Sequence, residues 1–329
     1  MLSVEGLTVA FRRGAESRRA VADVSFEVHR GKTLGLVGES GCGKSVTSLS
    51  LLRLLPEEAS VEGGRVLFEG ADLLTLPERE LRRVRGRRIA MVFQDPMTSL
   101  NPVYTVGWQI IEAIRLHEPV SRRAARARAV ELLRSVGIAD PAGRVDAYPH
   151  ELSGGMRQRA LLAMAIACGP ELLIADEPTT ALDVTVQAQI LELLRGFQRE
   201  RGMGMVLVSH DLGVVARYAD EVAVMYAGRV VERCPAKSLF EDARHPYTRA
   251  LLASLPPEGA SWYRGAPGRP KRLPTLEGSV PSPGEALPGC RFEPRCTRRQ
   301  PPCREGEPAL RAIAPGHFAR CLYAEEAPS

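Results

Sequence analysis

The chain has 329 residues, and 44% of them are hydrophobic, which suits one large domain with an appendage or two modest domains. The formal net charge is only +5 and nearly all basic residues are arginines, so the charge does not indicate a nucleic-acid-binding surface. The longest strongly apolar stretch, Ala160 to Pro170, is too short to cross a membrane, and a strand pattern begins near Leu2 with no signal sequence before it. We therefore expect a soluble, cytoplasmic chain.

Residues 1 to 33 predict antiparallel strands, with apolar positions from Leu7 to Phe11 and again from Val21 to Val28. A polar hairpin is expected between them, from Arg12 to Arg19. The ring of Phe11, at the end of the first strand, either packs at a sheet edge or stacks on adenine, as aromatic rings stack on bases elsewhere. The residue alone leaves both possibilities open.

A glycine-rich loop follows the apolar segment Leu34 to Val37, which predicts a buried strand. The residues after Lys44 can begin a helix, so the phosphate-binding pattern G-x-x-x-x-G-K-[ST] has the context that it requires. Its backbone N–H groups would face an anion, Lys44 would reach the β- and γ-phosphates, and the Ser45 hydroxyl would ligate Mg²⁺. We therefore expect a nucleoside triphosphate to bind at Gly38, Glu39, Ser40, Gly41, Cys42, Gly43, Lys44 and Ser45.

A polar amide follows the next predicted core strand, Ile89 to Phe93. Gln94 stands where open α/β sheets place ligand contacts, so it can touch Mg²⁺ or the attacking water. A helical pattern then runs from Val106 to about Ala167, and Ser121 is the expected N-cap of its second helix.

A serine and two glycines precede the last of these helices. Ser153 can cap the helix, and the glycines leave its N-terminus open to close approach. The pattern predicts either a second anion site or only a well-capped helix. The segment is Leu152-Ser153-Gly154-Gly155-Met156-Arg157-Gln158.

Two carboxylates end the buried strand that begins at Leu172. Asp176 would hold Mg²⁺ through water, because Mg²⁺ retains several waters and binds few protein carboxylates. Glu177 would act as general base for the water that attacks the γ-phosphate, or would orient it.

Two further polar residues follow on loops. Asp183 is the expected N-cap of a helix from Val184 to Arg201. His210 follows the strand Met205 to Ser209, where it can hydrogen-bond the γ-phosphate or the water. A single histidine at a strand end is more often structural, so the order of the motifs carries its assignment.

In this order the motifs resemble those of ATP-binding subunits of ABC transporters, over roughly residues 1 to 235. Several strings resemble a narrower group, the oligopeptide/dipeptide importer ATPases. They are Phe93-Gln94-Asp95-Pro96-Met97-Thr98-Ser99-Leu100-Asn101-Pro102, Tyr148-Pro149-His150-Glu151-Leu152, His245-Pro246-Tyr247-Thr248-Arg249-Ala250-Leu251-Leu252 and the tail from Gly278 to Cys321.

The resemblance implies an α/β fold. A P-loop (RecA-like) ABC nucleotide-binding domain would occupy residues 1–240, with an antiparallel β-subdomain and an inserted helical subdomain at about 96–165. A small, irregular extension that contains cysteines would occupy residues 241–329.

The resemblance also implies residue roles. Two such domains form a head-to-tail sandwich, with each ATP between the P-loop of one and the signature motif of the other. Phe11 would stack on adenine, and Asp183 would shape the dimer interface. The expected catalytic residues are Glu177, His210 and Gln94. The expected Mg²⁺ site comprises Ser45, Gln94 and Asp176. The signature residues that act across the dimer would be Ser153, Gly154, Gly155 and Gln158.

Cys42 is one departure from the family pattern, since serine is commoner in such loops. A thiol fits the space, so we expect activity to survive and the loop to be sensitive to alkylation.

Four of the seven cysteines stand near the end of the chain, spaced C-x5-C-x6-C-x17-C. A P-loop ATPase without a secretion signal belongs in a reducing compartment, so thiols or metal ligands are expected rather than disulfides. The spacing lacks the C-x2-C pairs of zinc ribbons. The resemblance favours a [4Fe–4S] cluster over zinc, and four unligated thiols are the alternative. These residues are Cys290, Cys296, Cys303 and Cys321.

The resemblance implies an ATPase at the cytoplasmic face of the cell (inner) membrane that powers uptake of di- and oligopeptides. Its partners would be a second ATPase subunit (a copy or a paralogue), two transmembrane permease subunits and an extracytoplasmic substrate-binding protein, with no nucleic acid. Nickel and oligosaccharide importers remain alternatives, because no residue here contacts cargo. A soluble ABC-type ATPase acting on DNA or the ribosome is disfavoured, because the chain has one motif set and only a compact helical segment between the P-loop and the signature.

Overall fold

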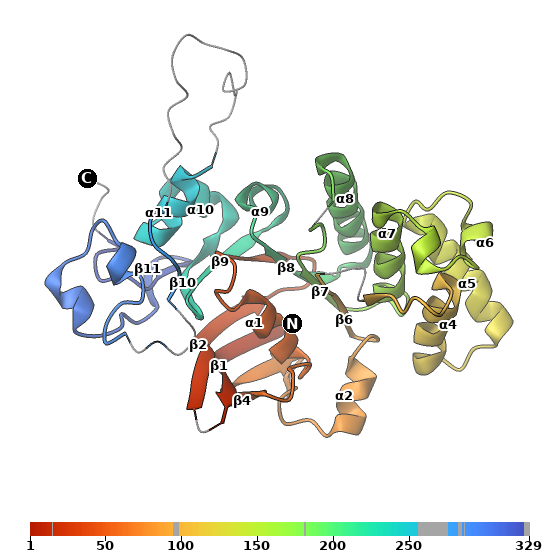
Figure 1. Ribbon diagram of the computed structural model, residues 1–329, viewed down its shortest axis with the longest axis horizontal. Coiled ribbons are helices and arrows are strands. Elements are labelled where there is room, and N and C mark those ends of the chain that lie inside the picture. The colour runs from red at the N-terminus through yellow and green to blue at the C-terminus, as the bar shows by residue number, and fades with distance from the viewer. Residues whose placement is uncertain are drawn as a thin grey trace, which may run out of the picture.

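The computed structural model describes residues 1–14, 16–94, 99–180, 182–255, 276–281, 285 and 287–325 (Figure 1). Two sequence expectations fall partly outside these residues. The string from Phe93 to Pro102, with the start of the helical subdomain, does so at 95–98, and the tail from Gly278 to Cys321 does so at 282–284 and 286.

An antiparallel sheet of four strands, ordered β2-β1-β4-β5, contains the N-terminal part of the chain. Its strands are β1 (Leu2–Arg13), β2 (Glu16–Val28), β4 (Ala59–Phe68) and β5 (Ala71–Asp72). The predicted hairpin from Arg12 to Arg19 was too long, because the pairing of β1 with β2 continues to Arg13 and Glu16. Polar side chains can occupy this extension because Arg12 and residues 16–19 are exposed to solvent, and Arg19 of β2 forms an ion pair with Glu62 of β4.

The core sheet has eight strands in the order β11-β12-β10-β9-β3-β8-β7-β6. Strands β9, β3, β8, β7 and β6 are parallel, and their carboxyl ends lie at one edge, where the predicted site residues follow. Every residue of β3, β7 and β8 is buried, as expected for parallel strands covered on both faces. The strands are β3 (Thr33–Val37), β6 (Ile89–Val92), β7 (Leu172–Asp176), β8 (Gly204–Ser209), β9 (Glu221–Tyr226), β10 (Arg229–Pro235), β11 (Arg311–Ala314) and β12 (His317–Ala319).

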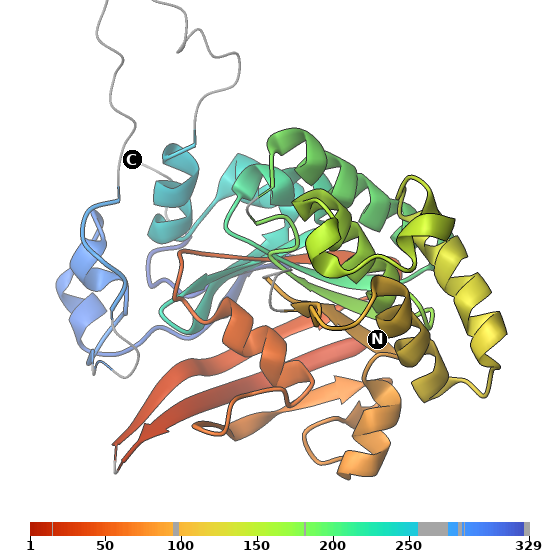
Figure 2. The ribbon, with the colours of Figure 1, turned by 45° about the vertical axis from the view of Figure 1, so that its right-hand side comes forward.

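Helices cover the core sheet and extend the molecule at one end. Helix α1 contacts strands of both sheets, and α4 to α7 pack together as the predicted helical subdomain (Figures 1 and 2). The predicted N-caps Ser121, Ser153 and Asp183 all accept the expected backbone hydrogen bond. The helices are α1 (Lys44–Leu51), α2 (Glu78–Val84), α4 (Val106–His117), α5 (Arg122–Ser135), α6 (Pro141–Arg144), α7 (Gly154–Ala165), α8 (Val184–Arg201), α9 (Leu212–Tyr218), α10 (Ala236–Asp242) and α11 (Pro246–Ala253). Short 3-10 turns are η1 (Pro149–Glu151), η3 (Glu293–Arg295) and η4 (Pro301–Arg304).

The C-terminal tail is more regular than the sequence predicts. Strands β11 and β12 form a hairpin, and β12 pairs with β10, so the tail enlarges the core sheet (Figure 1). The buried Glu232 of β10 accepts a 2.7 Å hydrogen bond from His317 of β12, which fixes the hairpin to the sheet. The sequence expectation of an irregular extension missed this because strands of three and four residues carry little periodicity.

None of the helices in the described parts of the chain is both long and apolar enough to span a bilayer.

Candidate active site

A pocket of about 430 Å³ lies over the loop between β3 and α1. Phe11 of β1 and Gln94 and Glu177 from the carboxyl ends of β6 and β7 line it together with the loop. Arg18, for which the sequence carried no functional signal, also lines it from β2. The loop residues in its wall are Ser40, Gly41, Gly43, Lys44 and Ser45.

Glycine is required at both ends of this loop. At Gly38, with φ 153°, a Cβ atom would lie 2.2 Å from the Met225 carbonyl oxygen. At Gly43, with φ 104°, it would lie 2.9 Å from the Ala20 carbonyl oxygen. The loop can therefore adopt its tight path against β9 and β2 only without these side chains.

The ammonium group of Lys44 donates to the Gly38 and Glu39 carbonyl oxygens, at 2.7 and 3.1 Å. These contacts hold the lysine along the loop, so its position depends on the path of Glu39. The Cys42 thiol, 3.9 Å from the same ammonium group, is completely buried, and burial raises its pKa. Both features argue against the expected sensitivity to alkylation, because reagents attack accessible thiolates.

The Glu177 carboxylate is the meeting point of the expected catalytic residues. Its Oε2 accepts a 3.1 Å hydrogen bond from the amide of Gln94 and lies 3.2 Å from Nδ1 of His210. The hydroxyl of Thr180 donates to the same oxygen at 2.9 Å. Glu177 also has a positive φ of 47°, which is uncommon outside glycine and frequent where structure is held for function.

Thr180 is a site residue that the sequence did not reveal. Its position three residues after Glu177 places it on the turn after β7, where its hydroxyl faces back to the carboxylate. A single threonine without a motif offers no sequence signal, so only the folded turn shows this contact.

The Asp176 carboxyl group has the properties of a magnesium ligand. It is 4% exposed, and its Oδ1 has no hydrogen-bond partner among the described residues. Burial, together with the charge of Glu177, raises its pKa, while its interaction with the Ser45 hydroxyl lowers it. A buried, unpaired carboxylate oxygen beside a hydroxyl fits a bound divalent cation, which would compensate the cost of burying the charge.

The signature residues do not line the described part of this pocket. Ser153 caps α7 by accepting a 3.3 Å hydrogen bond from the Met156 N–H, and a Cβ atom on Gly154 would meet nothing within 4 Å. The N-terminus of α7 is therefore open to close approach, whereas a Cβ atom on Gly155 would lie 3.1 Å from Val186. The side chain of Gln158 is buried, with neither amide atom bonded to a described residue.

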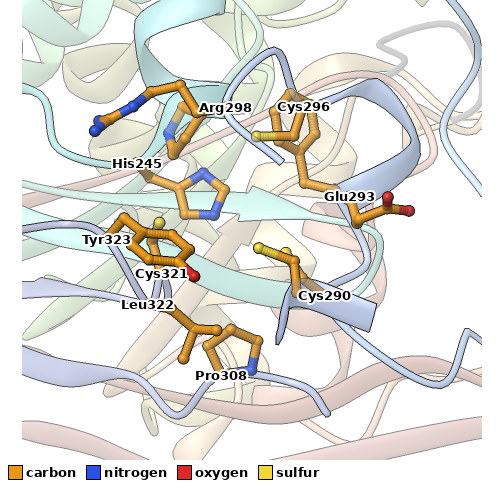
Figure 3. Close-up of a pocket in the computed structure, with 12 residues that line it drawn as sticks. His245, Cys290, Glu293, Cys296, Arg298, Pro308, Cys321, Leu322 and Tyr323 are labelled. Atoms are coloured by element: carbon orange, nitrogen blue, oxygen red, sulfur yellow. The ribbon is translucent and has the colours of Figure 1, made fainter. Parts of the chain in front are cut away.

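The four C-terminal cysteines, which stand between positions 290 and 321, line one pocket. Figure 3 shows the sulfurs of Cys290 and Cys296 directed into it beside the His245 ring. Burial raises the pKa of Cys290 to about 12, although the Phe292 N–H bonded to its sulfur lowers it. Backbone N–H groups two residues further on likewise bond the sulfurs of Cys296 and Cys321.

A second group of possible metal ligands consists of Glu232, Cys234 and His317, all buried and with ligand atoms within 4.8 Å of one another. The Glu232 carboxylate already accepts from the N–H groups of Arg244 and His245 and from His317. These bonds satisfy its charge, so the group serves to hold the tail on the core sheet.

Two family models match the chain. Residues 21–180 match the one described as ABC transporter, and residues 231–303 match the one described as oligopeptide/dipeptide transporter, C-terminal region. A Sinorhizobium fredii protein named as a peptide ABC transporter ATP-binding protein is 54% identical over 99% of this chain and 96% of its own length. A Brucella abortus protein named as a peptide import ATP-binding protein is 51% identical over 98% of this chain and 94% of its own length.

Solved structures share the fold of the nucleotide-binding part. The dimeric structure of MJ0796, a bacterial ABC transporter cassette, has a TM-score of 0.65 at 27% identity and covers 72% of this chain and 99% of its own. Its post-hydrolysis dimer bound to ADP and Pi matches with the same TM-score at 26% identity.

Domain content, full-length similarity and site geometry agree. The chain therefore belongs to the ABC transporter ATP-binding proteins with an oligopeptide/dipeptide transporter C-terminal region, and it is an ATPase that uses ATP and Mg²⁺.

Proposed function

We propose that the chain is the ATP-hydrolysing subunit of an importer for di- and oligopeptides, bound peripherally at the cytoplasmic face of the cell membrane. The observation that carries the hydrolytic role is the contact of Gln94, Thr180 and His210 with one oxygen of Glu177 beside the P-loop pocket. The C-terminal region and the peptide-related names of the relatives support the cargo.

In the proposed reaction, Phe11 stacks on adenine and the loop N–H groups with Lys44 hold the phosphates. Mg²⁺, held by Ser45, Asp176 and Gln94, would neutralise charge on the β- and γ-phosphates. The Glu177 carboxylate accepts a proton from the attacking water. His210 and Thr180 hold this carboxylate in place by their contacts with its Oε2 atom.

The second ATPase subunit completes each nucleotide site in this proposal. The open N-terminus of α7 lies outside the described lining of this chain's nucleotide pocket. It is therefore available to the γ-phosphate of an ATP molecule bound to the partner subunit. Ser153, Gly154 and Gly155 would make that contact, Gln158 would support the helix from within, and Asp183 would shape the interface. ATP binds the closed dimer better than ADP and phosphate do, and this difference can drive a membrane partner between two states.

A groove of about 670 Å³ near Gln94 supports docking to a permease. It lies between β6 and the helical subdomain, and its wall includes Phe93, which is 42% exposed, and Leu116, which is 76% exposed. Large apolar side chains at such exposure favour an apolar helix of a partner as the occupant.

Leu116→Glu should abolish copurification with the permease subunits and leave ATP binding intact, whereas Leu54→Glu, outside the groove lining, should change neither. Retained copurification of Leu116→Glu would exclude this groove as the docking site.

We also propose that the four tail cysteines hold a structural metal centre, a [4Fe–4S] cluster or zinc. Their shared pocket and the backbone N–H groups at three of the sulfurs support thiolate ligation. Protein purified anaerobically should contain iron or zinc, and serine at Cys290 or Cys303 should eliminate it, while Cys168→Ser should not. Absence of both metals from the wild-type protein would refute the proposal.

Gentle detergent extraction of native membranes tests the whole assembly. Recovery with two polytopic subunits, a second ATPase and a binding protein would support the importer, and the binding protein can then be screened with peptides, nickel and oligosaccharides. Tight binding of nickel or a sugar in place of peptides would correct the cargo. Recovery from the soluble fraction with DNA or ribosomes would overturn the transport role and leave the ATPase assignment unaffected.

A further inference from the structure

The P-loop is bonded to the cysteine-rich tail through Glu39. The Arg295 guanidinium donates to both oxygens of its carboxylate, at 2.7 and 3.0 Å, across 256 positions of the sequence. Glu39 does not line the described nucleotide pocket, so its side chain is directed to the tail although the sequence placed it among the ATP-binding residues.

Arg295 is held firmly enough to act as a fixed anchor. Its side chain is 6% exposed, its Nε donates to the Glu277 carbonyl oxygen at 2.9 Å, and its Nη1 lies 3.4 Å from the Tyr226 hydroxyl. A planar guanidinium with this many partners has a single orientation, and a bidentate pair with a carboxylate is geometrically specific.

The backbone of Glu39 is held by the same part of the molecule. Its N–H donates to the Tyr247 hydroxyl of α11 at 2.9 Å, while its carbonyl oxygen accepts from Lys44. Tyr247 packs against Phe292 and Tyr226 with ring centroids 5.4 and 4.6 Å away. An aromatic cluster of this kind is stiff, so the tail can restrain the loop that places Lys44, the expected phosphate-binding lysine.

A second arginine of the tail contacts the turn that is bonded to the loop near its other end. Arg291 donates to the Ala227 carbonyl oxygen and, at 3.3 Å, to Glu307. Gly228, next in the same turn, donates its N–H to the Cys42 carbonyl oxygen at 2.9 Å. Both arginines lie between Cys290 and Cys296, so one short segment contacts the loop directly at Glu39 and indirectly at Cys42.

We propose that Arg295 is a positioning residue for ATP binding: it fixes Glu39, and through the Glu39 carbonyl oxygen it fixes Lys44 and the phosphate-binding path of the loop. A loop held in its binding conformation loses less conformational freedom when the nucleotide binds, and that difference is expressed as affinity. The inference rests on the ATPase assignment and not on the peptide cargo or on a metal at the cysteines.

The first experiment titrates the full-length chain with a fluorescent ATP analogue and Mg²⁺. Arg295→Ala and Glu39→Gln should each weaken binding about tenfold, because each removes a charge-assisted bidentate contact. Arg304→Ala is the matched control: it removes a 2.9 Å ion pair with Glu293 in the same lobe, without contact to the loop, and its affinity should remain within about twofold of wild type.

The double variant Arg295→Ala/Glu39→Gln distinguishes positioning from general destabilisation. If Arg295 acts through Glu39, the double variant should bind no more weakly than the weaker single variant, because both remove one interaction. In steady-state kinetics, loss of the Arg295–Glu39 contact should raise KM for ATP and change kcat by less than about threefold. The reason is that this contact affects binding of ATP in the ground state.

Two outcomes would overturn the proposal. One is an affinity of folded Arg295→Ala and Glu39→Gln within about twofold of wild type, and the other is additive losses in the double variant. If Arg295→Ala does not fold, Glu39→Gln and Arg295→Lys decide the question, since the lysine keeps the charge but cannot form the fork, and should bind ATP more weakly than wild type.

Discussion

The Thr180 hydroxyl donates a 2.9 Å hydrogen bond to Oε2 of Glu177, so a residue without a motif of its own orients the proposed general base. The same oxygen receives the Gln94 amide and faces His210. These contacts hold Oε2, and no residue in the described part of the chain hydrogen-bonds the other oxygen, Oε1, which leaves it for water.

Replacement of Thr180 by valine should lower kcat for ATP about tenfold, because one hydrogen bond to a charged group is lost. KM should change little, since the hydroxyl contacts Glu177 rather than the P-loop. Steady-state phosphate release measures both quantities. Thr180→Ser keeps the hydroxyl and should retain near-normal kcat; an equal loss in both variants would mean that the methyl group, not the hydrogen bond, matters.

Glu177→Gln should reduce hydrolysis at least about 100-fold, because an amide cannot accept the proton of the attacking water. ATP binding should persist, so the variant should accumulate as an ATP-bound dimer on size-exclusion chromatography with its ATPase partner. Glu171→Gln, the same change at a surface ion pair with Arg88, is the control and should hydrolyse ATP normally. Normal turnover by Glu177→Gln would remove this residue as the base.

Cys42 should react slowly with N-ethylmaleimide, because its thiol is buried and its pKa is raised by that burial. Any loss of ATPase activity during alkylation should therefore proceed at the same rate in wild type and Cys42→Ser. The variant itself should be active. Marked protection by the serine would show that the loop opens enough to expose the thiol.

Acid should destabilise the fold through His245. Burial lowers its pKa to about 4, although the Glu232 carboxylate raises it, and Nδ1 accepts the Tyr247 N–H at 3.1 Å. The unfolded chain binds the proton more readily below pH 6.5, so stability is full above that pH and declines towards pH 4. From pH 7 to pH 5 we expect a loss of about 2 kcal/mol from this group.

Urea unfolding at the two pH values measures this loss. His245→Asn retains a helix-capping side chain and should remove most of the dependence, while His29→Asn, at an exposed position, should leave it unchanged. An undiminished dependence in His245→Asn would assign the acid sensitivity to other groups.

The local chemistry of the site could be predicted from the sequence. Strand-ending motifs place Gln94, Asp176, Glu177 and His210 at one edge because parallel strands align their carboxyl ends, whatever the remaining packing. The helix starts at Ser121, Ser153 and Asp183 were predictable for a similar reason, since a cap is a contact between residues three apart.

Only the tertiary structure decided which parts of the molecule the tail contacts. The short strand β12 joins the sheet because β10 offers an edge, and Arg295 reaches Glu39 across 256 positions of the sequence. No periodicity or motif spacing in the sequence predicts these contacts. Each of them depends on which surfaces remain uncovered once the core has formed. The sequence therefore determined which polar groups gather at the nucleotide pocket, and long-range packing determined how the glycine-rich loop of that pocket is held.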